Sequence, residues 1–315
     1  MKKTKPFISF VIPVYNEEGN LLWHYRQITK FAKKENLNYE VVYVNDGSTD
    51  NSLDILKNIR SKDGKVHFLA FSRNFGKESA LTAGMRKAKG DAVISMDADG
   101  QYPLDKIPDF LAEWRKGAQV VVGVRGENPS ETFVARLGSR AFYALLKMLD
   151  SQKDLVSRST DFRLLDRRVV DEYNRLTERN RVARNLMDWL GFKRAYVAFD
   201  ALERHDGKAT YTFNKRFKAA MDGIVKHSTA PLKLIGAAGI LISTVSVLTA
   251  IALAIETYVM GDPLNLSVTG TAILGLLLSF MIGIVLVCQG LLALYLENVY
   301  HETQNRPLYV IDEEG

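Results

Sequence analysis

Five short apolar stretches, rich in β-forming residues, recur over the first 125 residues of the chain. They cover residues 7–14, 39–44, 66–71, 92–96 and 120–124. Runs that are apolar at nearly every position are typical of strands buried on both faces of a sheet. The segments between them are compatible with helices, which we expect over residues 17–34, 52–61, 77–89 and 104–116. Strands that alternate with helices predict an α/β fold with a doubly wound, mostly parallel sheet.

The last quarter of the chain contains two long runs without a charged residue. The first, Leu234 to Ile255, has 22 residues, about 33 Å as a helix at roughly 1.5 Å per residue, enough for a hydrocarbon core of about 30 Å. The second runs from Pro263 to Leu296. We expect a two-helix transmembrane hairpin; a buried helical hairpin in a soluble core is the alternative. The predicted boundaries are 231–256 for the first span, 257–266 for an extracytoplasmic turn and 267–296 for the second span.

The distribution of basic residues predicts the orientation of this hairpin in the membrane. Lysines and arginines flank the first span, whereas the turn has none. Because basic residues stay on the cytoplasmic side, we expect both termini in the cytoplasm and the protein in the inner, cytoplasmic membrane. Residues 211–230 carry apolar side chains at helical spacing among lysines and arginines, which favours an amphipathic helix in the lipid interface; packing of this helix on its own domain stays open. The domain plan is completed by a cytoplasmic domain, residues 1–210, and a cytoplasmic tail, residues 297–315.

The charge of the chain limits its partners. The net charge is +6 overall, but residues 1–231 hold 40 basic and 29 acidic residues, an excess of +11. Such a domain needs an anionic partner, which is a nucleic acid, a lipid surface or a phosphorylated substrate. Nucleic acid is not expected, because no stacking platform or recognition motif is present. The single Cys288 cannot form an internal disulfide.

Polar, potentially ligating side chains follow each of the first four predicted strands. These strand ends read PVYNEE, NDGSTD, SRNFGK and DADGQ, beginning at residues 13, 45, 72 and 97. One such loop has an ordinary explanation as a turn or a helix cap. In a parallel α/β sheet, however, ligands bind at the carboxyl ends of the strands. Four polar strand ends on one edge therefore predict a site.

The sharpest feature of this edge is the pair Asp97 and Asp99. Two carboxylates separated by one residue can share a hard divalent cation that also binds phosphate oxygens. A single Asp-x-Asp sequence is, however, also common in turns. Neither a phosphate-binding Gly-x-x-x-x-Gly-Lys loop nor a Gly-x-Gly-x-x-Gly motif is present, which argues against a nucleoside triphosphatase and a dinucleotide dehydrogenase. Zinc is not expected, since histidines and cysteines do not cluster.

The segments VIPVYNEE, VNDGSTDNS, SRNFGKESALTAG and MDADGQYP, in this order, resemble the inverting family 2 glycosyltransferases with a GT-A fold. The resemblance is closest to the polyprenyl-phosphate glycosyltransferases, the group of dolichol-phosphate mannose synthase and the bactoprenol glucosyl transferases, and covers roughly residues 6–230. It implies transfer of a hexose, glucose first, from a UDP-sugar to undecaprenyl phosphate for a cell-envelope glycan. Two other donors, UDP-N-acetylglucosamine and GDP-mannose, are alternatives. An alternative of another class is a non-catalytic, membrane-anchored scaffold that binds a nucleotide. The chain could also form a homo-oligomer. Processive synthases carry Gln-x-x-Arg-Trp; Trp189 here lacks both partners, which favours a single transfer.

The resemblance also implies roles for individual residues. Asp97 and Asp99 would bind Mg²⁺ or Mn²⁺ bridging the diphosphate, with Asp99 counted as catalytic. Asp161 would lie near the attacking group, as a base or as an orienting residue. The nucleotide sugar would contact Pro13, Tyr15, Glu17, Asp46, Lys77, Asp97 and Gln101. The lipid phosphate would contact Arg125, Arg136, Ser139, Arg140, Arg204 and Lys208.

Overall fold

The computed structural model describes residues 5–126, 159–179, 181–202 and 270–315, with four single positions between 244 and 255. The chain divides into two compact units. Unit 1 consists of Met1–Glu131, Asp154–Ala209 and Asn305–Gly315, and unit 2 consists of Thr132–Lys153 and Thr210–Gln304. The two units are therefore described separately.

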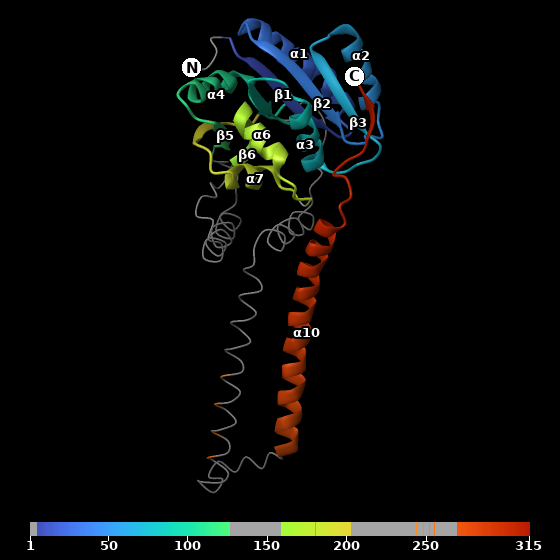
Figure 1. Cartoon of the computed structure of the whole chain (residues 1–315), viewed down its shortest axis with the longest axis vertical. Coiled ribbons are helices and arrows are strands. Elements are labelled where there is room, and N and C mark those ends of the chain that lie inside the picture. Colours follow the sequence, from blue (N-terminus) through green and yellow to red (C-terminus); the bar gives the residue numbers. More distant parts are fainter. Residues whose placement is uncertain are drawn as a thin grey trace. The chain divides into compact units, whose positions relative to one another are not determined.

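Unit 1 is built around one sheet, which has eight strands in the described part of the chain (Figure 1). Their order across the sheet is β7-β5-β6-β4-β1-β2-β3-β8. The strands are β1 (Phe7–Val14), β2 (Asn38–Asn45), β3 (Val66–Phe71), β4 (Ala92–Ser95), β5 (Val120–Arg125), β6 (Ser159–Asp166), β7 (Arg194–Phe199) and β8 (Ile311–Glu314). The four central strands, β3-β2-β1-β4, are parallel. The sheet order turns back between β1 and β4, which is where a doubly wound sheet binds its ligands.

Helices cover both faces of this sheet. They are α1 (Glu18–Lys34), α2 (Ser52–Lys62), α3 (Lys77–Lys87), a short 3-10 helix (Leu104–Lys106) leading into α4 (Ile107–Arg115), α6 (Arg167–Arg175) and α7 (Ala183–Trp189). Helices α1, α2 and α4 pack in one apolar core with Phe10 and Ile12 of β1, whereas α3, α6 and α7 pack in a second core with Val11. Neighbouring residues of β1 thus face opposite layers, as the pleat of a strand requires. The predicted α/β class, with strand and helix in alternation, is confirmed.

The expectation of a mostly parallel sheet is confirmed for the described strands, since β5 and β7 also pair parallel to each other; two strands, β6 and β8, run in the opposite direction. Strand β6 lies antiparallel between β4 and β5, and β8 lies antiparallel on the outer edge of β3. Hydropathy did not predict either strand. Asp161, Arg163 and Asp166 interrupt the apolar pattern of β6, and all four residues of β8 are exposed, three of them acidic. The segment predicted as a cytoplasmic tail, 297–315, contains the last part of a helix, which ends at Thr303, and this edge strand.

In unit 2, residues Gly270–Thr303 form one helix of 34 residues, α10. None of the helices in the described residues has the length and apolar character that crossing a membrane requires. The predicted amphipathic helix, 211–230, and the turn, 257–266, lie outside the described residues, as does the first span, 231–256, apart from Thr244, Leu248, Ala252 and Ile255. The predictions for these segments stay predictions.

His24 of α1 is buried in unit 1, with its Nδ1 atom 3.3 Å from the hydroxyl of Tyr43 on β2. Burial disfavours the charged imidazolium and lowers the pKa of His24 to about 4. In the unfolded chain the same side chain titrates near its ordinary pKa of about 6.5. Between these two values the unfolded chain takes up a proton that the folded chain does not. This contribution to stability is complete above about pH 6.5 and is lost as the pH falls toward 4.

We expect acidification from pH 7 to pH 4 to lower the free energy of unfolding by about 3 kcal/mol through His24, at about 1.4 kcal/mol per pKa unit. Urea unfolding of the wild type and of His24→Gln at several pH values measures this term. The glutamine variant is expected to be less stable at pH 7 and to approach the wild type at pH 4. A constant difference between the two proteins across this range would contradict the assignment.

Candidate active site

The loops that follow β1 and β2 are tied together by reciprocal hydrogen bonds. The amide of Asn16 donates to Ser48 Oγ at 3.0 Å, and the amide of Thr49 donates back to Asn16 Oδ1 at 2.8 Å. The amide of Glu18 donates to Asp50 Oδ2 at 3.0 Å. Asn16 has a φ of +55°, a left-handed conformation that asparagine tolerates better than most residues. The two loops, residues 15–18 and 46–51, therefore form one ordered rim at the carboxyl ends of β1 and β2.

Three residues predicted to contact the nucleotide lie along this rim. Pro13 is part of β1, Glu17 is the N-cap residue of α1, and Tyr15 between them is 48% exposed. The exposed ring of Tyr15 is a surface on which a planar base can stack.

Asp46, directly after β2, holds the next loop of the edge in place. Its carboxylate is buried and accepts hydrogen bonds from the amides of Phe75, at 2.7 Å, and Gly76, at 2.9 Å. Burial raises the pKa of Asp46, while these two amides and Arg73 act in the opposite direction. The resemblance implied a contact of Asp46 with the nucleotide sugar. The observed contacts give Asp46 a further task, because they fix the loop between β3 and α3.

Gly47 makes this close approach of two loops sterically feasible. It has a φ of +63°, and a Cβ atom at this position would lie 2.3 Å from the carbonyl carbon of Arg73 and 2.5 Å from the amide nitrogen of Asn74. Any side chain would push the loop away from Asp46. The glycine of the NDG motif is therefore required by backbone packing.

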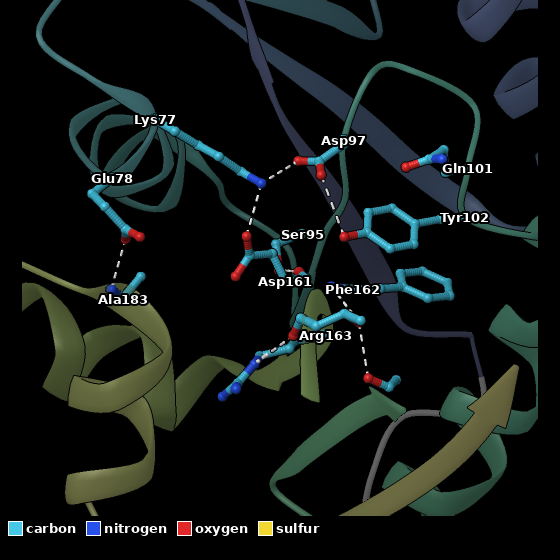
Figure 2. A network of polar contacts seen from close by, with 12 residues as sticks. Lys77, Glu78, Ser95, Asp97, Gln101, Tyr102, Asp161, Phe162, Arg163 and Ala183 are labelled. Atoms are coloured by element: carbon cyan, nitrogen blue, oxygen red, sulfur yellow. Dashed lines mark hydrogen bonds and ion pairs between the residues drawn. The ribbon is translucent and has the colours of Figure 1, made fainter. Parts of the chain in front are cut away.

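Figure 2 shows the ammonium group of Lys77 between the carboxylates of Asp97 and Asp161. The Nζ atom of Lys77 is 2.6 Å from Asp97 Oδ1 and 2.7 Å from Asp161 Oδ2. Lys77 begins α3, Asp97 follows β4 and Asp161 belongs to β6, so three elements place these side chains together. The hydroxyl of Tyr102 donates to Asp97 Oδ2 at 3.3 Å. The Lys77, Asp97 and Asp161 side chains are 41%, 28% and 25% exposed, so solvent and small ligands can reach the group.

The charges of this group act on one another. Burial lowers the pKa of Lys77, but the carboxylates of Asp97 and Asp161 outweigh burial and raise it above its ordinary range. Burial also raises the pKa of Asp97, and the negative charges of Asp161 and Asp99 add to this effect while Lys77 opposes it. Lys77 thus pairs with two carboxylates, and Asp99 adds a further negative charge that acts on Asp97.

The pKa of Asp161 is shifted in the opposite direction from the pKa of Asp97. Burial alone would raise its pKa, but the charges of Lys77, Arg184 and Arg163 outweigh burial and hold the pKa of Asp161 below its usual range. Asp161 is therefore ionised at neutral pH and is a weak proton acceptor.

The loop after β4 is held in a tight turn that places Asp99 beside Asp97. Asp99 is buried, and its Oδ1 atom accepts a hydrogen bond from the amide of Gln101 at 3.1 Å. Gly100 has a φ of +78°, and a Cβ atom there would lie 2.5 Å from the ring of Trp23 on α1. Arg125, at the end of β5, reaches the same turn and donates to Gln101 Oε1 at 3.5 Å.

The described residues do not bring three His, Cys, Asp or Glu side chains together as a complete metal site. A cation held by Asp97 and Asp99 would therefore need ligands from a bound substrate, and diphosphate oxygens are suitable ligands for Mg²⁺.

The structure thus brings most of the predicted site residues to one edge of the sheet. This edge contains Pro13, Tyr15, Glu17, Asp46, Lys77, Asp97, Asp99, Gln101, Arg125 and Asp161. Five residues predicted for the lipid phosphate lie outside the described residues, namely Arg136, Ser139, Arg140, Arg204 and Lys208.

Sequence reasoning missed three residues that shape this site. Ser95 Oγ donates to the main-chain oxygen of Asp161 at 2.6 Å, and Tyr102 stacks on Phe162, with ring centroids 5.0 Å apart. Arg184 of α7 acts on Asp161 by its charge. Tyr102 belongs to the MDADGQYP segment, so its closeness in sequence to Asp97 and Asp99 could have indicated it. The approach of Arg184 depends on a helix position that the sequence did not predict.

Comparison with known proteins identifies relatives over nearly the whole chain. The sequence pattern described as glycosyl transferase family 2 matches residues 9–174. The chain is 38% identical to the uncharacterized glycosyltransferase YkcC of Bacillus subtilis (strain 168), over 97% of this chain and 93% of the relative. It is 34% identical to the SfII prophage-derived bactoprenol glucosyl transferase of Shigella flexneri, over 96% of this chain and 97% of the relative.

Among solved structures, the mannosyltransferase PcManGT from Pyrobaculum calidifontis, in complex with GDP-Man and Mn²⁺, matches with a TM-score of 0.46 and 16% identity. The match covers 95% of this chain and 88% of that chain.

Proposed function

The chain belongs to glycosyl transferase family 2 and is a glycosyltransferase, and from this premise we propose that it transfers glucose from UDP-glucose to undecaprenyl phosphate. The observation that carries the proposal is the similarity of this chain, over nearly the full length of both chains, to a protein named as a bactoprenol glucosyl transferase. The sheet edge supports it, because the edge offers an exposed ring for a base and carboxylates for a cation that binds a diphosphate.

The reaction breaks one bond and forms one. An oxygen of the acceptor phosphate attacks the anomeric carbon of the sugar, the bond from this carbon to the diphosphate oxygen breaks, and the electron pair leaves with the nucleoside diphosphate. A phosphate monoester has a second pKa of about 6, so the attacking oxygen is already ionised at neutral pH. A general base is not required. The low pKa of Asp161 agrees with this, and we assign Asp161 the task of holding Lys77 and orienting the reactants.

Asp97 and Asp99 are the residues that would hold Mg²⁺ or Mn²⁺. The chemistry fits, since carboxylate oxygens are preferred ligands of these cations and both side chains lie in the loop that directly follows β4. When bound, the cation would neutralise the negative charge that develops on the leaving diphosphate. Lys77, within reach of both Asp97 and Asp161, supplies a second positive charge from the protein itself.

Attachment to the cytoplasmic membrane is part of the proposal and rests on the two uncharged runs, Leu234 to Ile255 and Pro263 to Leu296. The topology of unit 1 supports an even number of crossings. Strand β8, after these runs, pairs with β3, which precedes them, so both flanks of the runs belong to one sheet. A single crossing would separate two strands that are hydrogen-bonded to each other.

A transfer assay tests the proposal. Membranes that contain the protein are incubated with Mg²⁺, undecaprenyl phosphate and, separately, radiolabelled UDP-glucose, UDP-N-acetylglucosamine or GDP-mannose. We expect label to enter the organic phase from UDP-glucose. Label from one of the other donors instead would correct the sugar. Absence of label from all three, with folded protein, would contradict the proposed reaction and favour a nucleotide-binding scaffold.

A further inference from the structure

The C-terminal segment Asn305–Gly315, referred to below as the tail, is joined to the free edge of the sheet. The chain end marked C in Figure 1 lies beside β3. Gly315 and Phe68 exchange two main-chain hydrogen bonds, each 3.0 Å long, and the amide of Ser72 donates to the oxygen of Val310 at 3.1 Å. This pairing removes an open sheet edge, which otherwise invites association with other chains.

The inner end of the tail contacts the loop that binds Asp46. The ring of Tyr309 stacks on Phe71, with centroids 4.9 Å apart and planes 10° from parallel, and Phe71 in turn contacts the ring of Phe75 edge-on at 5.8 Å. Phe75 is the residue whose amide donates to Asp46 at 2.7 Å. A continuous series of contacts therefore runs from the tail to the rim of the site.

The outer end of the tail is attached differently. Glu313 forms an ion pair with Lys57 at 2.6 Å, and Glu314 forms one with Lys87 at 2.9 Å. Both pairs are partly exposed, and such pairs contribute little to stability. They join the tail to Lys57 and Lys87, which lie outside residues 72–76. The segment thus has an outer part with two ion pairs and an inner part in which Tyr309 stacks on Phe71, the last residue of β3.

We propose that Tyr309 is a positioning residue for the donor site: its ring holds Phe71 and Phe75 so that the amides of Phe75 and Gly76 stay on Asp46 and the rim keeps the shape that binds the nucleotide. This inference rests on the proposed function. The geometry requires an aromatic ring at position 309 and gives its hydroxyl a minor part, since the hydroxyl is 3.4 Å from Arg86 Nη1 at the surface.

The test compares Tyr309→Ala, Tyr309→Phe and Glu313→Gln in the full chain. For Tyr309→Ala we expect the KM for the nucleotide sugar to rise about tenfold, as loss of roughly 1.4 kcal/mol of ring packing implies, with kcat within about twofold of the wild type. Tyr309→Phe is expected to restore the wild-type KM. Glu313→Gln weakens the attachment of the tail away from the loop and is expected to leave the KM unchanged.

Hydrogen exchange gives a readout that does not depend on turnover. Tyr309→Ala is expected to accelerate exchange of the amides of Phe75 and Gly76, and Glu313→Gln is not. Equal KM values and equal exchange in Tyr309→Ala and the wild type would overturn the inference. So would a tenfold rise in KM that Tyr309→Phe fails to reverse. Failure of the proposed function would appear in the wild type itself, as absence of sugar transfer.

Discussion

Replacement of Asp99 by asparagine is expected to lower divalent-metal-dependent sugar transfer by about 1,000-fold, the size of effect seen when a group that stabilises transition-state charge is lost. Asparagine keeps an oxygen that can accept the hydrogen bond from the amide of Gln101, so the turn after β4 is preserved. It removes the negative charge that makes Asp99 a ligand for a hard cation. The measurement is the rate at which label from the sugar donor enters the organic phase, as a function of Mg²⁺ concentration.

Asp105→Asn is the matched control for Asp99→Asn. Asp105 lies six residues later, on the 3-10 helix before α4, and is exposed. The same change of charge at this position is expected to leave the transfer rate within about twofold, because solvent screens an exposed charge. Membrane attachment should be equal in both variants. A transfer rate in Asp99→Asn close to that of the control would remove Asp99 from the metal site.

The sequence predicted those parts of the fold whose signal is local. Strands β1 to β5 are apolar at almost every position because both of their faces are buried, and their predicted bounds differ from the observed ones by at most one residue. Strand β6 gives no such signal, since it carries Asp161 into the site and Arg163 into the interior. Strand β8 pairs with the edge of β3 through main-chain hydrogen bonds. The hydropathy of side chains does not predict such bonds.

The grouping of the candidate site residues in the fold was predictable to the same extent and for the same reason, while their roles stay predictions. Topology alone brings strand ends together, so the edge with Asp46, Asp97 and Asp99 follows from the alternating pattern. The contact of Lys77 with Asp161 joins residues 84 positions apart and depends on β6 lying next to β4. Lys77 was accordingly predicted as the start of a helix and as a contact of the nucleotide sugar, and its position between two carboxylates is a finding of the structure.

Replacement of Lys77 by glutamine is expected to have two effects of opposite sign. The first is on metal binding. Without the ammonium group, Asp97 loses a partner at 2.6 Å and Asp161 loses one at 2.7 Å, so the carboxylates face one another with less compensation. A divalent cation then neutralises more charge, and we expect Mn²⁺ to bind the donor-free variant more tightly than it binds the donor-free wild type. Titration calorimetry or the Mn²⁺ electron paramagnetic resonance signal measures this change directly.

The second effect is on turnover, which is expected to fall about 100-fold, because a preorganised positive charge beside the reacting groups is removed. The pH dependence should change too. Lys77 lowers the pKa of Asp161, so its loss raises that pKa, and the fall in activity on acidification begins at a higher pH than in the wild type. Lys116→Gln breaks an ion pair of similar length on the surface, 2.7 Å to Glu113, and is expected to change neither property. Tighter Mn²⁺ binding together with slower transfer would assign Lys77 to both the resting and the reacting site. Unchanged transfer with tighter Mn²⁺ binding would restrict its role to the resting site, where its charge offsets those of Asp97 and Asp161.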